Sequence, residues 1–176
     1  MARLTQFSIL FAGALLFLSI PGTVDSYAST RASPGKESFY VEGQVYCDTC
    51  RAQFINKLTV FMPGAGVKLQ CRGEGEGNIT YTVAGSTNEK GVYRLLVEGD
   101  HEDEFCEIKL VSSTIKDCDE IPNEGWAKQS SRITLTVNNG IHGDVRIANP
   151  LGFFKKEALP ECIELFKELD ILPPDL

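Results

Sequence analysis

The clearest pattern along the chain is an alternation of apolar and polar residues. It begins at residue 38, where SFYVEGQVYC places Phe39, Val41 and Val45 on one face and Glu42 and Gln44 on the other. A period of two residues is typical of a strand that buries one face. The same pattern recurs in five later runs: Val67, Leu69 and Cys71; Ile79, Tyr81 and Val83; Tyr93, Leu95 and Val97; Cys106, Ile108 and Leu110; and Ile133, Leu135 and Val137.

The segments between these runs favour an all-β fold. They are rich in Gly, Asn, Asp and Ser, as in GEGEGN, GDHEDE and NNG, and their spacing is typical of hairpins and longer loops. The sequence therefore predicts an antiparallel β-barrel or sandwich of about seven strands.

One segment near the C-terminus has helical periodicity instead. Pro160 suits the first turn of a helix, and Pro173 and Pro174 stop it. We expect this short amphipathic helix to pack on its own domain rather than to dock on a partner. Its predicted apolar face comprises Cys162, Ile163, Leu165, Phe166, Leu169 and Leu172.

The N-terminal segment predicts secretion. Residues 7–20, FSILFAGALLFLSI, carry no charge and are too few for a typical membrane span, and Ser26 and Ala28 form an A-x-A-like cleavage site. We therefore assign residues 1–28 to a signal peptide, residues 29–37 to a flexible leader and residues 38–176 to one β domain. No membrane insertion is expected after cleavage.

Cleavage after Ala28 predicts a defined N-terminus. We expect the secreted chain to begin at or near Ser29, because Ala28 is the best-placed small residue after the apolar segment. Mass spectrometry of the secreted protein would check this position. Recovery from the medium of a chain that still begins at Met1 would contradict it.

The net charge of −7 limits the kinds of partner. An acidic protein repels the phosphates of nucleic acids and of anionic lipids, so neither is expected to bind. Cleavage removes Arg3 and Asp25 together, which leaves this charge unchanged. All six cysteines follow the cleavage site and meet an oxidising compartment, where an even number predicts three disulfides.

Cys47 and Cys50 have a spacing that redox motifs, metal sites and structural disulfides share. A thioredoxin-like role requires a βαβ context and structural zinc requires a second ligand pair, and this sequence contains neither. It also lacks a G-x-S-x-G elbow, and His101 and His142 stand outside any motif of a catalytic base, so both are expected to be solvated. We therefore predict no enzyme activity, no metal site and no cofactor.

Three polar motifs have simpler interpretations. GEGEG is expected to be a mobile hairpin connection, because it lacks the glycine spacing and the lysine of a phosphate-binding loop. DHEDE is expected to form a solvated turn, because it lacks the ligand ladder of a calcium loop. Asn78 begins the sequon N-I-T just after the glycine-rich turn, which predicts N-glycosylation in a secreted chain.

The segment EGQVYCDTCR, residues 42–51, resembles the signature of the Ole e I-like family, the plant pollen proteins that include the major olive-pollen allergen. The resemblance continues through GAGVKLQCR, FCEIKLVSS, the DC at 117–118 and ANPLGFFKKEALPEC. It implies a secreted, disulfide-stapled β-barrel or sandwich with no known catalytic activity. It also implies one pairing among the fifteen that six cysteines allow: Cys47 with Cys118, Cys50 with Cys162, and Cys71 with Cys106.

The leading hypothesis is a non-enzymatic secreted protein of pollen or a related tissue that acts by binding. Its partner would be an extracellular protein, either a cell-surface receptor or a wall component during pollen hydration and tube growth. Two alternatives remain open: a secreted thiol-disulfide enzyme that uses Cys47 and Cys50, and a small-molecule carrier that uses a barrel interior.

Overall fold

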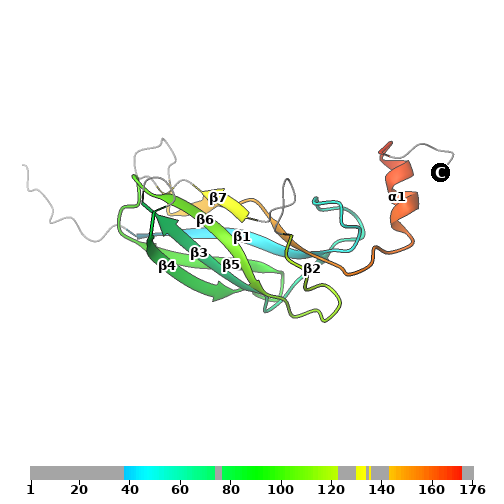
Figure 1. The fold of residues 1–176 in the computed structure, drawn as a ribbon, viewed down its shortest axis with the longest axis horizontal. Helices are drawn as coiled ribbons and strands as arrows, with labels where there is room; N and C mark the ends of the chain where they lie inside the picture. Colours follow the sequence, from blue (N-terminus) through cyan, green and yellow to red (C-terminus); the bar gives the residue numbers. More distant parts are fainter. Residues whose placement is uncertain (1–37, 74–76, 123–129, 134, 136–142, 172–176) are drawn as a thin grey trace, which may run out of the picture. The chain divides into compact units, whose positions relative to one another are not determined.

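The computed structural model describes residues 38–73, 77–122, 130–133, 135 and 143–171. They form two β-sheets and one short helix (Figure 1). The predicted signal peptide and leader, residues 74–76 of GEGEG and His142 lie outside the described residues. The elements are β1 (Ser38–Asp48), β2 (Val60–Phe61), β3 (Gly66–Arg72), β4 (Ile79–Ser86), β5 (Val92–Glu98), β6 (Phe105–Ser112), β7 (Ser130–Ile133), β8 (Val145–Ile147), β9 (Leu151–Phe154) and α1 (Cys162–Glu168).

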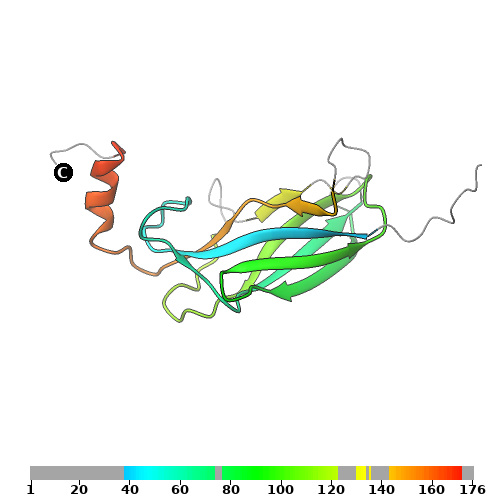
Figure 2. The same cartoon turned by 180° about the vertical axis from the view of Figure 1, so that it is seen from behind.

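Strand β1 is the centre of the first sheet. It pairs antiparallel with β5 over residues 38–44 and with β2 at Tyr46 and Cys47. It pairs in parallel with β8 and then with β9, which lies beside residues 45–48. The second sheet has the order β4-β3-β6-β7 with antiparallel pairs throughout. The view from behind shows β1 and β5 in front of the second sheet (Figure 2).

The apolar faces predicted from the alternation meet between the two sheets. Phe39, Val41 and Val45 of β1 and Val67 and Leu69 of β3 are all buried in one core. Removal of this apolar surface from water is the main force that holds the sheets together. Other members of the core are Met62, Tyr93, Leu95, Val97, Ile108, Leu110, Leu135, Leu151 and Phe153.

Strand β4 departs from the predicted pattern. Ile79 was expected to face the core together with Tyr81 and Val83, but its side chain is 52% exposed. Tyr81 and Val83 are only partly buried against the core. The reason is a bulge: Cys71 faces Tyr81 and Arg72 faces Ile79, so Thr80 is an additional residue and Ile79 falls outside the regular alternation.

The alternation of apolar and polar residues does not predict strands β2, β8 and β9. Strands β2 and β8 contain two and three residues, too few to show a period, and β9 is buried at every position. The described residues therefore form nine strands rather than about seven, and β1 has two parallel neighbours where antiparallel ones were expected. Alternation reports which face of a strand is buried and does not report its direction or its partner.

Helix α1 is shorter than the predicted segment from residue 160 to 172. It ends where Asp170 adopts a left-handed conformation with φ of 55°, and the Ile171 N–H donates back to the Phe166 carbonyl. This pattern is typical of a helix C-terminus. Within the described residues, no helix has the length and apolar character that a membrane span requires.

The helix packs on its own domain by only part of its apolar face. Cys162 and Leu165 are buried in a small cluster, apart from the main core, with Leu58 as one neighbour. Ile163 and Leu169 were expected to pack inward, but they are 51% and 46% exposed. The buried cluster contains Cys162 and Leu165 of the helix, so Ile163 and Leu169 remain partly in water.

Candidate binding surface at the disulfide hub

All six cysteines are paired, and none is free. The bridges are Cys47–Cys118, Cys50–Cys162 and Cys71–Cys106, which is the pairing that the family resemblance implies. The first two begin at the C-terminal end of β1 and its following turn, and they close sequence separations of 71 and 112 residues. We call this end of the domain the disulfide hub.

Asp48 organises the turn between Cys47 and Cys50. Its side chain is fully buried, and its carboxylate accepts hydrogen bonds from the backbone N–H groups of Cys50 at 3.3 Å, Ala52 at 3.0 Å and Gln53 at 2.5 Å. Sequence reasoning missed this role. An available signal was the position of an Asp at the end of a strand, directly before a turn, because Asp side chains often bond to the backbone two residues further on.

The same turn has unusual backbone conformations. Arg51 and Gln53 have φ values of 57° and 63°, a left-handed region that costs energy for residues other than glycine. The buried carboxylate of Asp48 accepts the Gln53 N–H, and Cys50, directly before Arg51, is bonded to Cys162, so both constrain these residues. The turn is therefore rigidly defined by its surroundings.

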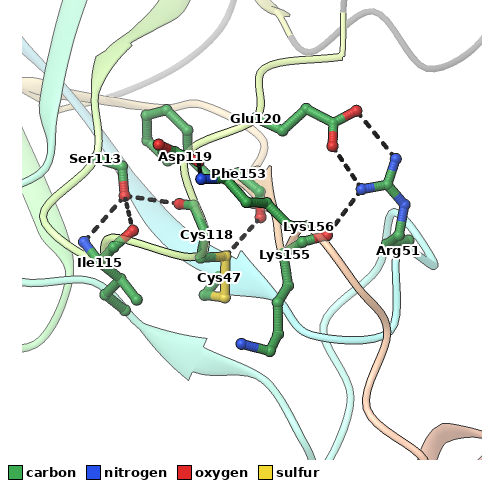
Figure 3. A network of polar contacts seen from close by, with 10 residues as sticks. All are labelled: Cys47, Arg51, Ser113, Ile115, Cys118, Asp119, Glu120, Phe153, Lys155 and Lys156. Carbon is green, nitrogen blue, oxygen red and sulfur yellow. Dashed lines mark hydrogen bonds and ion pairs between the residues drawn. A yellow bond between two sulfur atoms is a disulfide. The ribbon is translucent and has the colours of Figure 1, made fainter.

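Arg51 connects the turn to a segment 69 residues away, as Figure 3 shows. Its guanidinium donates to both carboxylate oxygens of Glu120, at 2.7 and 3.0 Å, and to the Lys155 carbonyl at 2.8 Å. It also lies 4.7 Å from the centre of the Phe154 ring. Such bidentate pairs have a fixed geometry, so Arg51 orients the turn as well as neutralising a charge.

The Arg51 and Glu120 pair has a defined response to pH. The hydrogen bonds from Arg51 lower the pKa of the Glu120 carboxyl, and they raise the pKa of the Arg51 guanidinium. A carboxyl whose pKa is lowered on folding stabilises the folded protein at pH values above its pKa in the unfolded chain. This stabilisation is lost as the pH falls through the pKa of the folded protein. The effect is small because Glu120 is exposed to solvent.

A second polar network fixes the segment that carries Cys118 (Figure 3). The Ser113 hydroxyl accepts the Ile115 N–H at 3.1 Å, and it lies 2.7 Å from the carbonyl of Cys118, to which it donates. The Sγ atom of Cys118 lies 3.2 Å from the Phe153 carbonyl on β9. These contacts place the Cys47–Cys118 bridge between β1, β9 and the segment after β6.

The hub also joins the 51–61 segment to α1. The Thr49 hydroxyl donates to the Leu58 carbonyl at 2.8 Å, and Leu58 packs in the cluster around Cys50 and Cys162. Lys57 forms an ion pair with Glu168 of the helix. These contacts connect the 51–61 segment to helix α1 and fix the position of both on the domain.

Several large apolar side chains are exposed on the two segments that the hub holds. Phe54 and Ile55 are 37% and 41% exposed, and Val60, Ile163 and Leu169 are similarly open to water. Large apolar groups that remain in water on a fixed scaffold are typical of interaction sites. We define the hub surface as Phe54, Ile55, Val60, Phe61, Ile163, Leu169 and Ile171.

His101 differs from its predicted solvated state. It is only 8% exposed, and its Nδ1 lies 2.6 Å from Glu104 Oε2, while its ring centroid lies 4.4 Å from that of Tyr81. It is buried because the turn after β5 folds back over Tyr81. The carboxylates of Asp100, Glu102 and Asp103 in the same turn belong to exposed residues.

His101, Glu104 and Cys71 lie close enough together to suggest metal ligands, since their ligand atoms are within 4.8 Å of one another. Cys71, however, is bonded to Cys106, so it has no thiolate to offer. The two remaining ligands are fewer than a structural zinc site needs.

The residue of the predicted glycosylation sequon, Asn78, is exposed and lies directly before the first residue of β4.

The chain matches the family described as "Pollen protein Ole e 1 like" over residues 37–170. The chain belongs to this family. This finding confirms the family resemblance that the cysteine-bearing segments carry.

Individual relatives within the family are pollen and anther proteins. The chain is 52% identical over 143 residues to the major pollen allergen Lig v 1 of Ligustrum vulgare, covering 81% of this chain and 97% of the relative. It is 47% identical over 137 residues to the anther-specific protein LAT52 of Solanum lycopersicum, covering 78% and 83%. The crystal structure of the major plantain pollen allergen Pla l 1 matches with a TM-score of 0.65 at 42% identity, covering 72% of this chain and 100% of that one.

Proposed function

We propose that this family member is a secreted, non-enzymatic pollen protein that acts by binding an extracellular protein, either a cell-surface receptor or a wall component. The observation that carries the proposal is the hub surface. Two disulfides, the buried Asp48 carboxylate and the Arg51–Glu120 pair hold a turn of unusual conformation next to exposed apolar side chains. A surface ordered before binding loses less entropy when the partner docks.

The geometry argues against thiol chemistry at the C-x-x-C segment. Cys47 and Cys50 are bonded to Cys118 and Cys162 rather than to each other, and both are buried. A redox motif needs an accessible thiolate at one of these positions. The cysteines are better explained as structural elements of a binding scaffold.

The carrier alternative has less support from the interior. Large side chains such as Tyr93 and Phe153 are fully buried between the sheets and occupy the space that a ligand would need. A hollow of about 250 Å³ lies instead at the surface of the first sheet, beside Gly43 and the exposed Ile147. A second surface hollow, beside Asp117, Lys155 and Lys156, has a volume of about 310 Å³. Both volumes lie at or below the lower end of the range of typical small-molecule sites.

The proposal is tested by changing the hub surface. Replacing Phe54 and Ile55 together by Ser should weaken binding to a pollen-tube surface fraction by about tenfold or more, because central apolar side chains carry much of the binding energy. The matched control is Leu96→Ser with Val111→Ser, two exposed apolar residues on β5 and β6. Equal losses in both double variants would contradict the proposed surface.

An alkylating reagent separates binding from thiol chemistry. Treatment of the native protein should leave binding unchanged, since all six cysteines are in disulfides. Loss of binding or activity after alkylation would favour the thiol-disulfide enzyme instead.

A further inference from the structure

Strand β4 is a long, uncharged margin of its sheet. In the described part of the chain it pairs with β3 on one side and with no strand on the other. Strand β5 lies near it, since a short turn joins Ser86 to Val92 and the Tyr81 hydroxyl accepts the Glu98 N–H at 3.3 Å. Figure 1 labels β4 at the margin of its sheet. An open margin presents backbone N–H and C=O groups to which another strand can pair.

The other margins of the two sheets are short or charged. Strands β2, β8 and β9 contain two, three and four residues. Strand β7 has four residues and includes Arg132, and β5 includes Arg94 and Glu98. Short strands and charged side chains are the common means by which proteins prevent edge pairing.

Strand β4 has neither feature. Its eight residues, ITYTVAGS, contain no charge and no proline, and β-branched and aromatic side chains favour extended backbone. A bulge at Thr80 interrupts the register with β3, but residues 81–86 pair regularly. Two copies of this stretch can pair antiparallel about a two-fold axis without placing like charges opposite each other.

The sequon lies at the beginning of this open margin. Asn78 is exposed and directly precedes Ile79, the first residue of β4. A carbohydrate at this position is bulky and strongly hydrated, so a second β4 strand could not approach the same margin. We infer that β4 is a self-association edge for a second copy of this chain, and that a glycan on Asn78 keeps it unpaired.

The test compares oligomeric state with and without the glycan. The secreted, glycosylated protein should remain monomeric in analytical ultracentrifugation across a wide concentration range. The Asn78→Gln variant, and wild type treated with an N-glycan-removing enzyme, should show a doubling of mass that increases with concentration. Intact-mass measurement establishes that Asn78 carries the glycan in the starting material.

Added charges on β4 locate the interface. Adding Thr82→Lys and Ala84→Lys, at two exposed positions, to the Asn78→Gln variant should restore the monomer, because the four new positive charges of a dimer would repel. The control adds the same charge elsewhere, as Leu96→Lys with Val111→Lys, and should leave the dimer intact. Circular dichroism and melting curves check that each variant is folded.

Three results would overturn the inference: an unmodified Asn78 in the secreted protein, a folded Asn78→Gln variant that stays monomeric, or a dimer that persists with both lysines on β4. None of these results bears on the hub surface, because β4 and the hub involve different residues. The two proposals therefore fail or stand separately.

Discussion

Replacing Asp48 by Ala is expected to lower the free energy of unfolding by about 3 kcal/mol, because three backbone N–H groups lose a charged acceptor. The bonds from Cys50, Ala52 and Gln53 converge on this one buried carboxylate. Without it, the left-handed conformations at Arg51 and Gln53 also lose their main support. Denaturant unfolding of wild type and variant measures the difference.

Two further variants make this prediction specific. Asp48→Asn keeps an oxygen that can accept from Cys50 and Ala52 but places an amide group toward Gln53, so its loss should be intermediate. Asp103→Ala removes an exposed acid from the turn after β5 and should change stability by less than about 0.5 kcal/mol. A small loss for Asp48→Ala, similar to this control, would contradict the assigned role.

Replacing Cys50 and Cys162 together by Ser is expected to lower the free energy of unfolding by about 4 kcal/mol, because the bridge restricts a long stretch of the unfolded chain. The bridge closes a sequence separation of 112 residues. It also links α1 covalently to the turn after β1, and the buried cluster around the helix is small. Amide exchange should therefore show early opening of α1 while the sheets remain protected.

The Cys71–Cys106 bridge provides the matched comparison. It joins two paired strands inside the main core and closes only 35 residues. Its removal should destabilise the domain by a similar or slightly smaller amount without releasing α1. If partner binding depends on the hub surface, it should weaken in the Cys50/Cys162 variant and persist in the Cys71/Cys106 variant under conditions where both sheets are folded. The opposite result would place the binding surface elsewhere.

Much of the architecture followed from local pattern. Alternation identified β1 and the later long strands and placed residues such as Phe39, Val41 and Leu69 in the core. A strand with one buried face has apolar residues at every second position, so its sequence shows this pattern. The apolar spacing near the C-terminus identified α1, and the sequence motifs around the cysteines identified the family. These features depend on residues that are close together in the sequence.

Other features were decided only by tertiary structure. The parallel pairing of β8 and β9 with β1, the contact of Arg51 with Glu120 and the burial of Asp48 and His101 all depend on segments far apart in sequence. The sequence determined which side chains could be buried and that six cysteines were available for disulfides, since these properties belong to single residues and local periods. It left open which distant groups would meet, because that depends on how the two sheets close around the core and where the hub fixes the turn and α1.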